Sequence, residues 1–339
     1  MTFDRARAFV VSHGESFVVL CRRRARDRNP RARRSMSATA TASATLSAPQ
    51  RLQPRIDACN TITPEAYASF VPFIIDGHRV GALTPWFAER ALVACEAALE
   101  RDAGGAVRVR PELTTADARS RAIAPGLRKL RDDGVITGWR DEIFPCAMGY
   151  GQEILLRVER ASVSLLGVRA YGVHVNGYVT LANGTKELWV ARRAANKQTF
   201  PGKLDHLVAG GLPDGMAPSE CVVKECGEEA SVPESLAVRA KPVSAVSYAM
   251  NYNGCCKRDV LFCYDLELPE DFVPVPDDGE VESFERFSIE AVIERMATTE
   301  DFKPNCCLVI IDFCVRHGYI TPDQAGYVKL VQSLRLAND

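Results

Sequence analysis

The sequence lacks a hydrophobic run long enough to cross a membrane. The apolar stretch FVVLC at residues 17–21 is far shorter than the about 20 residues that a spanning helix needs. It is also too short, with its flanking residues, for the apolar region of a secretory signal peptide, which takes about 7–15 residues. We therefore expect no membrane partner for this chain.

Strong net charge is missing as well, because 42 basic and 43 acidic side chains leave a formal charge of −1. Broad nucleic-acid binding calls for a basic surplus, so we expect no nucleic-acid partner. The phosphate-binding pattern GxxxxGK[ST] is absent too, which argues against a kinase. With 339 residues, 47% of them hydrophobic, the chain can bury one or two ordinary cores.

Paired cysteine motifs are also lacking, although the chain has 12 cysteines. No CxxC pair occurs, and Cys255-Cys256 and Cys306-Cys307 are adjacent doublets. Adjacent doublets suit neither a zinc knuckle nor a disulfide framework in a chain of this length. We expect free thiols in a reducing compartment.

The chain does contain a dense carboxylate cluster in GGLPDGMAPSECVVKECGEEASV, residues 210–232. Glu225, Glu228 and Glu229 stand at i, i+3 and i+4, so a helix brings them to one face. Such like charges repel one another unless a cation lies between them. Carboxylate oxygens suit Mg²⁺, whereas zinc favours histidine and cysteine. The opposite helix face carries Val222 and Cys226 at i and i+4, which is the stripe needed to pack on a sheet.

A glycine-rich loop precedes this helix and permits close approach of the backbone to a phosphate or a metal. The alternative is a solvated acidic helix face, since glutamate is a good helix former. The fixed spacing between the loop and the carboxylates favours the metal site.

The whole unit resembles the Nudix box, G-x5-E-x7-R-E-U-x-E-E-x-G-U, where U is aliphatic. Gly210 stands at its first glycine, and Glu225, Glu228 and Glu229 stand at its three core glutamates. Three positions depart from the pattern, namely Met216 for the early glutamate, Lys224 for the arginine and Ser231 for the late glycine. Lysine cannot make the planar two-pronged contact of arginine, but Lys224 can still pair with Glu228 at i+4.

The flanking sequences resemble the thiamine pyrophosphokinase-related branch of the Nudix hydrolases, from about Ile62 to the C-terminus. The resemblance implies metal-dependent hydrolysis of a diphosphate, namely thiamine diphosphate or its oxidised forms, to the monophosphate. It implies Mg²⁺ (or Mn²⁺) held by Gly210, Glu225, Glu228 and Glu229, with the three glutamates also catalytic. The alternatives are hydrolysis of 8-oxo-dGDP or another nucleoside diphosphate derivative, or a diphosphate-binding module without turnover. A homodimer is left open.

Two further groups are candidates for the site. Arg193 and Lys197 follow the expected strand ELWVA, and their cationic groups suit phosphate oxygens, although a solvated strand end is the alternative. Glu280 and Glu282 lie in an acidic run after FVPVP and are candidates for an extra carboxylate, the alternative being a polar turn.

We divide the chain into a disordered tail (1–58), an α+β domain (59–167) and a Nudix domain (168–339). Helices are expected over 87–99 and 115–133 in the first domain and over 289–298 and 305–317 in the second. Strands alternating with the box helix predict an α/β/α sandwich with a mixed sheet for the Nudix domain.

The N-terminal segment is poor in acids, with twelve arginines against Asp4, Glu15 and Asp27 in its first 55 residues. An arginine-rich, serine-rich and acid-poor composition is typical of organelle transit peptides. We expect a plastid (chloroplast) location, with a mitochondrial or cytoplasmic one as the alternative. A basic tail that contacts an acidic partner is a second explanation for this composition.

Overall fold

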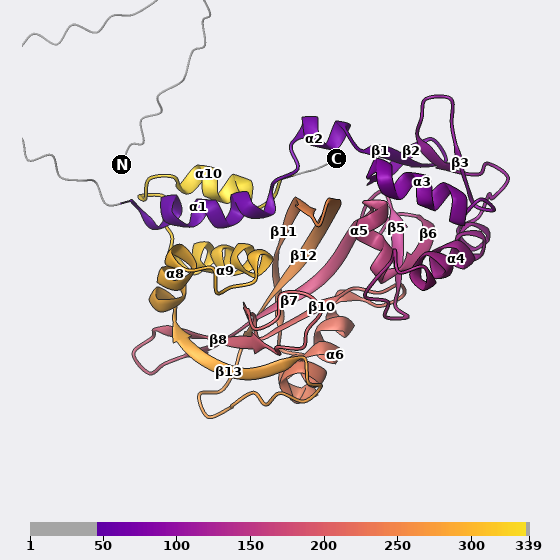
Figure 1. The fold of residues 1–339 in the computed structure, drawn as a ribbon. Helices are drawn as coiled ribbons and strands as arrows, with labels where there is room; N and C mark the ends of the chain where they lie inside the picture. Colours follow the sequence, from indigo (N-terminus) through magenta and orange to yellow (C-terminus); the bar gives the residue numbers. More distant parts are fainter. Residues whose placement is uncertain (1–45, 337–339) are drawn as a thin grey trace, which may run out of the picture. The chain divides into compact units, whose positions relative to one another are not determined.

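The computed structural model describes residues 46–336. The transit peptide predicted from the first residues lies largely outside this range. The described part contains an N-terminal α+β region and a larger sheet with helices on both faces (Figure 1).

The N-terminal region is built on a four-stranded sheet with the order β2-β1-β4-β3. Its strands are β1 (Val71–Ile75), β2 (His78–Leu83), β3 (Leu99–Arg101) and β4 (Val107–Val109). Strands β1 and β2 form a hairpin whose turn residues Asp76 and Gly77 have φ of 50° and 79°. This explains the Asp-Gly pair, since a tight hairpin turn of this kind needs positive φ at both positions. His78 and Arg79 begin β2.

Helices α3 (Pro85–Ala94) and α4 (Ala116–Asp132) pack on this region. Each begins after a threonine, Thr84 or Thr115, whose hydroxyl accepts a backbone hydrogen bond from the first turn. The helix predicted over 115–133 is therefore confirmed. The prediction over 87–99 is partly wrong, because α3 ends at Ala94 and Leu99 starts the short strand β3.

A two-stranded hairpin of β5 (Ile143–Ala147) and β6 (Ile154–Glu159) follows, then the short helices η1 (Arg160–Ser162) and α5 (Val163–Leu166). Gly167, with φ of 62°, ends α5 and leads directly into the second sheet. A side chain at this position would meet the backbone of Ala82 at 2.1 Å, so glycine is required where the two regions join.

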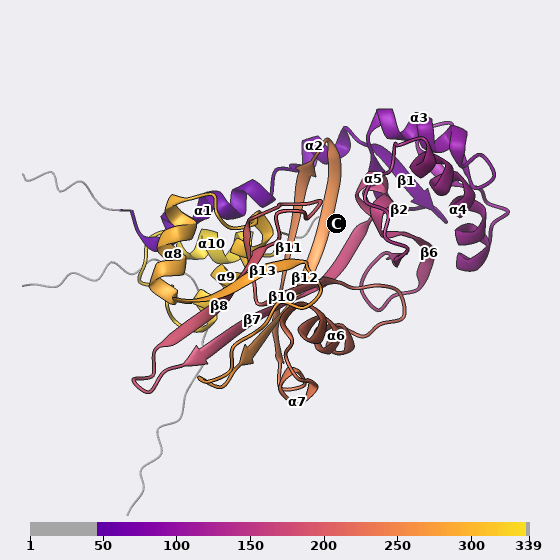
Figure 2. The same ribbon diagram turned by 60° about the horizontal axis from the view of Figure 1, so that its bottom comes forward.

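The second sheet has seven strands, with β11-β12-β7-β8-β13 in order, β10 paired to β7 and β9 paired to β8 (Figure 2). The strands are β7 (Arg169–Thr180), β8 (Lys186–Arg193), β9 (Leu204–Asp205), β10 (Val208–Gly211), β11 (Lys241–Tyr252), β12 (Cys255–Glu267) and β13 (Val281–Ser288). Strands β7 and β12 run parallel and the other pairs run antiparallel, so the sheet is mixed as predicted.

Helices cover both faces of this sheet, with α6 (Pro218–Ala230) on one side and α8 (Ile289–Thr298) and α9 (Pro304–Arg316) on the other (Figure 1). Side chains alternate between the two faces along each strand, so each face of the sheet has its own hydrophobic core. Val173 and Trp189 join Val222 of α6, while Leu188 and Leu261 join the core under α8 and α9. The α/β/α sandwich is therefore confirmed, as are the helices predicted over 289–298 and 305–317, to within a residue.

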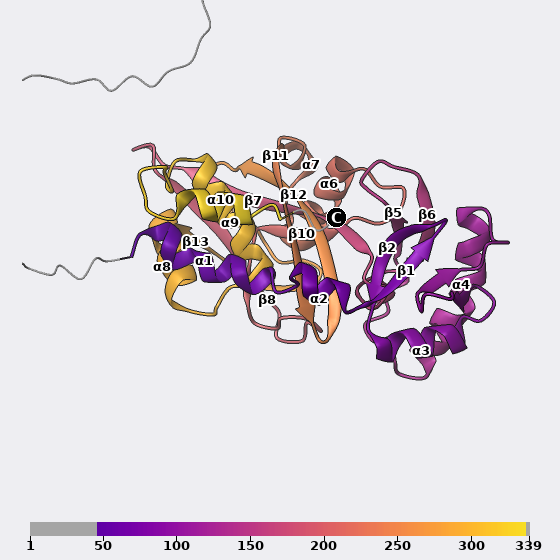
Figure 3. The same cartoon turned by 90° about the horizontal axis from the view of Figure 1, so that it is seen from above.

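Helix α1 (Ala48–Cys59) corrects the prediction of a disordered tail through residue 58. Leu52, Ile56 and Cys59 are fully buried against α8, α9 and α10 (Tyr327–Ser333), beside which α1 lies in Figure 3. Their spacing of four and three residues places them on one helical face. The N-terminal segment thus completes the core of the C-terminal helices.

Two general findings concern the described residues. Among residues 46–336, no helix is both long and apolar enough to cross a membrane. The eleven cysteines in this range form no disulfide with one another, and ten of them are buried.

Candidate functional site

The glycine loop and the acidic helix form one compact unit. Strand β10 pairs with β7, the chain turns through residues 212–217, and α6 begins at Pro218, whose missing N–H costs nothing in the first turn. A side-chain carbon on Gly210 would lie 2.5 Å from the side chain of Glu225. Position 210 therefore has to be glycine for the Glu225 carboxylate to lie against the backbone of β10.

Glu229 is the most buried of the three glutamates, at 8% exposure. Its carboxylate accepts a hydrogen bond of 3.0 Å from the backbone N–H of Ala209 in β10. Burial nevertheless dominates and raises the pKa of Glu229 to about 8. A cation beside this carboxylate would favour its charged form.

Glu225 and Glu228 are more accessible and share a lysine. The Lys224 ammonium lies 3.3 Å from the Glu225 carboxylate and 2.5 Å from that of Glu228, which confirms the predicted i, i+4 pair. Partial burial raises the pKa of Glu225 despite this neighbour. The side chain of Glu228 is half exposed, at 51%.

The structure adds carboxylates from outside the helix. Ligand oxygens of Glu229, Asp278 and Glu280 lie within 4.8 Å of one another. We call these three residues the acidic group. Glu280 was a candidate from the sequence, whereas Asp278 was seen only as part of an acidic run. Glu282 is exposed at the bulge of β13 and is not a member of this group.

Oxygen donors of this kind fit a hard divalent cation, which takes carboxylate oxygens and waters. The fit is supported by Glu229, whose carboxylate is buried with a single backbone donor. Burial also raises the pKa of Asp278. Burial acts in the same direction on Glu280, but hydrogen bonding and charge from Lys197, together with Arg140, outweigh it and lower the pKa of that carboxyl.

The two predicted phosphate-binding cations occupy different settings. Lys197 forms an ion pair with Glu280 and therefore lies at the acidic group. Arg193 is turned into the protein, where it donates to Asp205 at 2.9 Å and to the carbonyls of Phe200 and Thr199 at 3.1 and 2.9 Å. Phosphate contact remains a prediction for both residues.

The departures from the box pattern have local structural settings. Ser231 ends α6 with φ of 50°, a left-handed conformation that favours glycine, and its hydroxyl donates to the carbonyl of Val275 at 2.9 Å. Met216 is partly buried against the core beneath α6. An apolar side chain thus packs at the position where the family pattern has a carboxylate.

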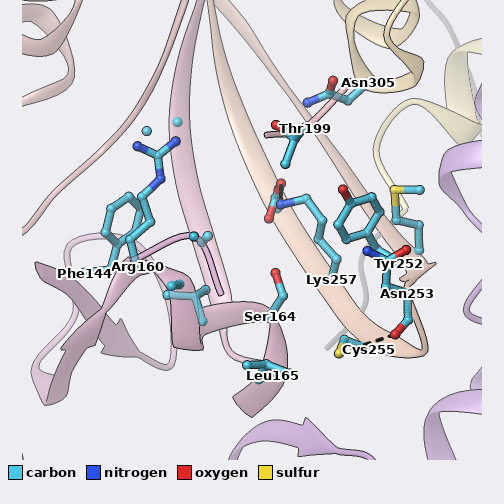
Figure 4. A pocket seen from close by; sticks show the side chains of 18 of the residues that line it. Phe144, Arg160, Ser164, Leu165, Thr199, Tyr252, Asn253, Cys255, Lys257 and Asn305 are labelled. Atoms are coloured by element: carbon cyan, nitrogen blue, oxygen red, sulfur yellow. Dashed lines mark hydrogen bonds and ion pairs between the residues drawn. The ribbon is translucent and has the colours of Figure 1, made fainter. Parts of the chain in front are cut away.

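A cavity of about 1040 Å³ adjoins the box. Ala209 and Gly210, which contact Glu229 and Glu225, form part of its wall. Figure 4 shows Arg160 and Phe144 on one side and Lys257 and Tyr252 on the other. The wall therefore draws residues from the N-terminal region as well as from the second sheet.

The cavity wall combines cations with aromatic rings. The cations are Arg140, Arg160, Lys257 and Lys303, against Asp259 as the carboxylate among the described lining residues. The aromatic side chains are Trp86, Phe144, Tyr171, Phe200, Tyr248 and Tyr252. Such a wall suits an anionic ligand that carries an aromatic group.

The N-terminal region reaches the box directly. A side-chain carbon on Gly211 would lie 2.8 Å from Phe144 and 3.4 Å from the Arg160 guanidinium. Arg157 of β6 pairs with Asp214 of the box loop at 2.6 Å. No motif in residues 59–167 pointed to these contacts, because they depend on how the hairpin β5–β6 docks against β10.

Arg140 connects the cavity to the acidic group, because it lines the cavity and lies 3.5 Å from Glu280. Tyr252 lines the cavity, whereas Tyr264 is buried in the core beneath α6. The side-chain oxygen of Asn251 accepts a hydrogen bond from the backbone N–H of Gly254 in the β11–β12 turn.

Comparison with known proteins agrees with this geometry. A model described as a domain of unknown function, DUF4743, matches residues 51–170, and the NUDIX domain model matches residues 172–305. Nudix hydrolase 20, chloroplastic, of Arabidopsis thaliana is 43% identical over 288 residues, which cover 83% of this chain and 76% of that protein. Nudix hydrolase 24, chloroplastic, of the same plant is 42% identical over 281 residues, with the same two coverages.

Among solved structures, DR0079 from Deinococcus radiodurans matches with a TM-score of 0.39 and 21% identity, over 50% of this chain and 98% of that chain. The sandwich, the box and the two plant relatives together define a hydrolase that acts on diphosphate linkages and uses a divalent metal. The chain belongs to the Nudix hydrolase family.

Proposed function

We propose that this chain hydrolyses the phosphoanhydride bond of thiamine diphosphate or its oxidised analogues to give the monophosphate, with Mg²⁺ (or Mn²⁺) as the metal. One observation carries the proposal. The acidic group adjoins a cavity whose wall is cationic and aromatic. Two residues of that wall contact the acidic group, because Arg140 pairs with Glu280 and the Ala209 backbone N–H donates to Glu229. Diphosphate and heterocycle thus find complementary surfaces side by side.

The metal neutralises non-bridging phosphate oxygens when it is bound. Glu229, Asp278 and Glu280 would hold it. Glu225, Glu228 and the Gly210 carbonyl would be further ligands, as the resemblance to the box implies. A glutamate of the box orients the attacking water or takes its proton. Lys197 and Arg160 place positive charge beside the diphosphate, and Arg193 holds the loop that carries Lys197.

The aromatic wall takes the heterocycle. Tyr252 of β11 and Phe200 lie with ring centroids 5.8 Å apart, and Phe144 lies across the cavity next to Arg160 (Figure 4). Aromatic rings make favourable contacts at centroid distances of about 4.5–7 Å, so a further ring can pack against this pair. The N-terminal region therefore contributes to substrate selection through Phe144 and Arg160.

The test is product release from thiamine diphosphate, oxythiamine diphosphate, 8-oxo-dGDP and ADP-ribose with Mg²⁺ or Mn²⁺. Wild type is compared with Glu229→Gln and with Glu234→Gln, an exposed carboxylate at the start of α7 (Glu234–Ala237). We expect thiamine compounds to be cleaved, Glu229→Gln to lose about 10²-fold or more, and the control to retain wild-type rates.

Turnover of the nucleotides alone would overturn the choice of substrate. Absence of turnover with any compound, while metal still binds, would instead indicate a diphosphate-binding module. A second comparison tests the cavity, with Arg160→Ala against Arg239→Ala, an exposed arginine. Loss of a charged hydrogen bond of about 1.5–3 kcal/mol predicts a KM about 10- to 160-fold higher for Arg160→Ala.

We further propose a plastid location, because the two plant relatives are named chloroplastic and the N-terminal composition is that of a transit peptide. A fusion of residues 1–58 to a fluorescent protein tests this. Signal in plastids supports the proposal, and signal confined to the cytoplasm or to mitochondria contradicts it.

A further inference from the structure

A second group of metal-binding side chains lies on the other face of the sheet from α6. It consists of His174 in β7, His206 between β9 and β10, and Cys306 in the first turn of α9. One ligand atom from each lies within 4.8 Å of the others. Their exposures are 4%, 3% and 0%, so the group is almost completely buried, and His174 lies in the wall of the cavity described above.

The two histidines leave ring nitrogens without partners. Within residues 46–336, Nδ1 of His174 and both Nδ1 and Nε2 of His206 are buried and accept or donate no hydrogen bond. A buried polar atom without a hydrogen-bond partner destabilises the fold, so such atoms are rare without a reason. The two rings meet edge to face with centroids 4.9 Å apart.

A carboxylate lies beside the thiol, although it is not within 4.8 Å of all three ligand atoms. Asp205 Oδ1 lies 2.6 Å from the Cys306 sulfur and accepts from the His206 backbone N–H at 2.9 Å. Zinc bonds of about 2.0–2.3 Å in a tetrahedral site place ligand atoms about 3.3–3.8 Å apart. The 4.8 Å limit, which holds for His174, His206 and Cys306, is about 1 Å wider. Side-chain rotations have to close this difference and bring Asp205 to the same point.

We propose that His174, His206 and Cys306, with Asp205 as the fourth ligand, form a second metal site that takes a zinc-class transition ion. Two imidazoles, a thiolate and one carboxylate are the donors that zinc prefers, whereas Mg²⁺ selects oxygen ligands. Cys306 loses its proton to solvent as the metal binds. This site is distinct from the acidic group and goes beyond the proposed hydrolysis.

The position of the site gives it a structural role. Its ligands join the central strand β7, the segment that leads into the box strand β10, and the N-terminus of α9. Asp205 and His206 precede Ala209 by only a few residues. An ion here fixes the start of β10, and β10 in turn holds Glu225 and Glu229.

Neighbouring charges set the strength of binding. Asp205 already pairs with Arg193 at 2.9 Å and with Lys303 at 3.2 Å, and these cations oppose a further positive charge. We expect weaker binding than in a site with four thiolates, with the metal released by a strong chelator.

The test uses the full chain without a histidine tag, stripped with chelator, reloaded with Zn²⁺ and desalted before metal analysis. Cys306→Ser is compared with Cys307→Ser, its neighbour in the same turn, which is 2% exposed and outside the group. We expect wild type and Cys307→Ser to keep about one zinc per chain and Cys306→Ser to lose it. Glu229→Gln should also keep its zinc, which separates this site from the acidic group.

Loading with Co²⁺ provides a second readout that does not rely on activity. Cobalt bound to a thiolate gives a charge-transfer absorption, so wild type should show this band and Cys306→Ser should not. If Cys306→Ser fails to fold, His206→Gln replaces it as the test variant. Its circular dichroism should be native and its cobalt band weaker than that of wild type. Wild type without zinc and without the cobalt band overturns the proposal, as does full zinc retention by Cys306→Ser.

Discussion

Replacing Gly210 with alanine places a methyl group where the Glu225 side chain lies. The new carbon would be 2.5 Å from Cγ and Cδ of Glu225, about 1 Å closer than the 3.4–4 Å of ordinary contact. Gly210 is fixed by its pairing to Val173 in β7, so the glutamate has to move. We expect the fold to persist with the carboxylate displaced by about 1 Å.

The magnitude follows from two effects. Overpacking of a well-filled site costs about 1–3 kcal/mol of unfolding free energy. A 1 Å misplacement of a reacting geometry can reduce the rate by about 10²-fold. Gly210→Ala should therefore lose most of its activity at a moderate loss of stability.

Gly227→Ala provides the matched control, because Gly227 lies inside α6 and an added carbon meets nothing within 4 Å. Alanine in a helix interior is favoured over glycine by about 0.8–1.0 kcal/mol, so this variant should be more stable than wild type and fully active. Thermal unfolding measures the stability of the two variants, and diphosphate hydrolysis measures their activity. Full activity of Gly210→Ala, or equal effects of the two substitutions, would refute the assignment of Glu225 to the site.

Three more predictions concern stability. Ile56→Ala should lower the unfolding free energy by about 2–5 kcal/mol in a denaturant titration, because Ile56 is fully buried, whereas a residue in a disordered tail would change nothing. Asp265 is buried, but hydrogen bonds and charge from His317, Arg316 and Asn176 lower its pKa. Its carboxylate therefore stabilises the fold at pH values above the unfolded pKa of about 3.9, and this stabilisation is lost as the pH falls through the lower pKa of the folded state. Asp265→Asn should cost about 3–5 kcal/mol near pH 7, with the difference from wild type shrinking in acid-unfolding curves below about pH 4. Burial raises the pKa of Glu229 to about 8, so the folded chain keeps a proton that the unfolded chain releases between about pH 4.5 and 8. With chelator present to remove metal, the unfolding free energy of wild type should therefore fall by up to about 5 kcal/mol relative to that of Glu229→Gln as the pH rises through this window. Identical pH profiles of the two proteins in chelator would contradict the burial of this carboxylate.

Local patterns in the sequence predicted α4, α8 and α9 to within a residue at each end. The spacing of Val222 and Cys226 against Glu225 and Glu229 placed one face of α6 on the sheet and the other at the site, and Thr115 marked the start of α4. Such features depend on neighbours within one or two helical turns, which the sequence displays directly. The same reasoning found Glu280 because it lies in a conspicuous acidic run.

Contacts between distant segments were beyond these patterns. The first helix looked like the end of a tail, since its apolar side chains Leu52 and Ile56 gain meaning only from the surface of α9 and α10. Glu282 looked as suitable as Glu280, and only the bulge at the start of β13 separates them. Arg160 carries no motif at all, because its place beside Gly211 is decided by the docking of another region.

The sequence by itself determined the class of chemistry, because three carboxylates on one helical face and the glycine before them are encoded within 20 residues. It also determined the alternation of strands and helices. The tertiary structure alone decided which cations and rings surround the box and which histidines meet Cys306. The physical reason is that sheet order and register place residues more than 100 positions apart within hydrogen-bonding reach, as with Asp205 and Cys306, and no local periodicity specifies that pairing.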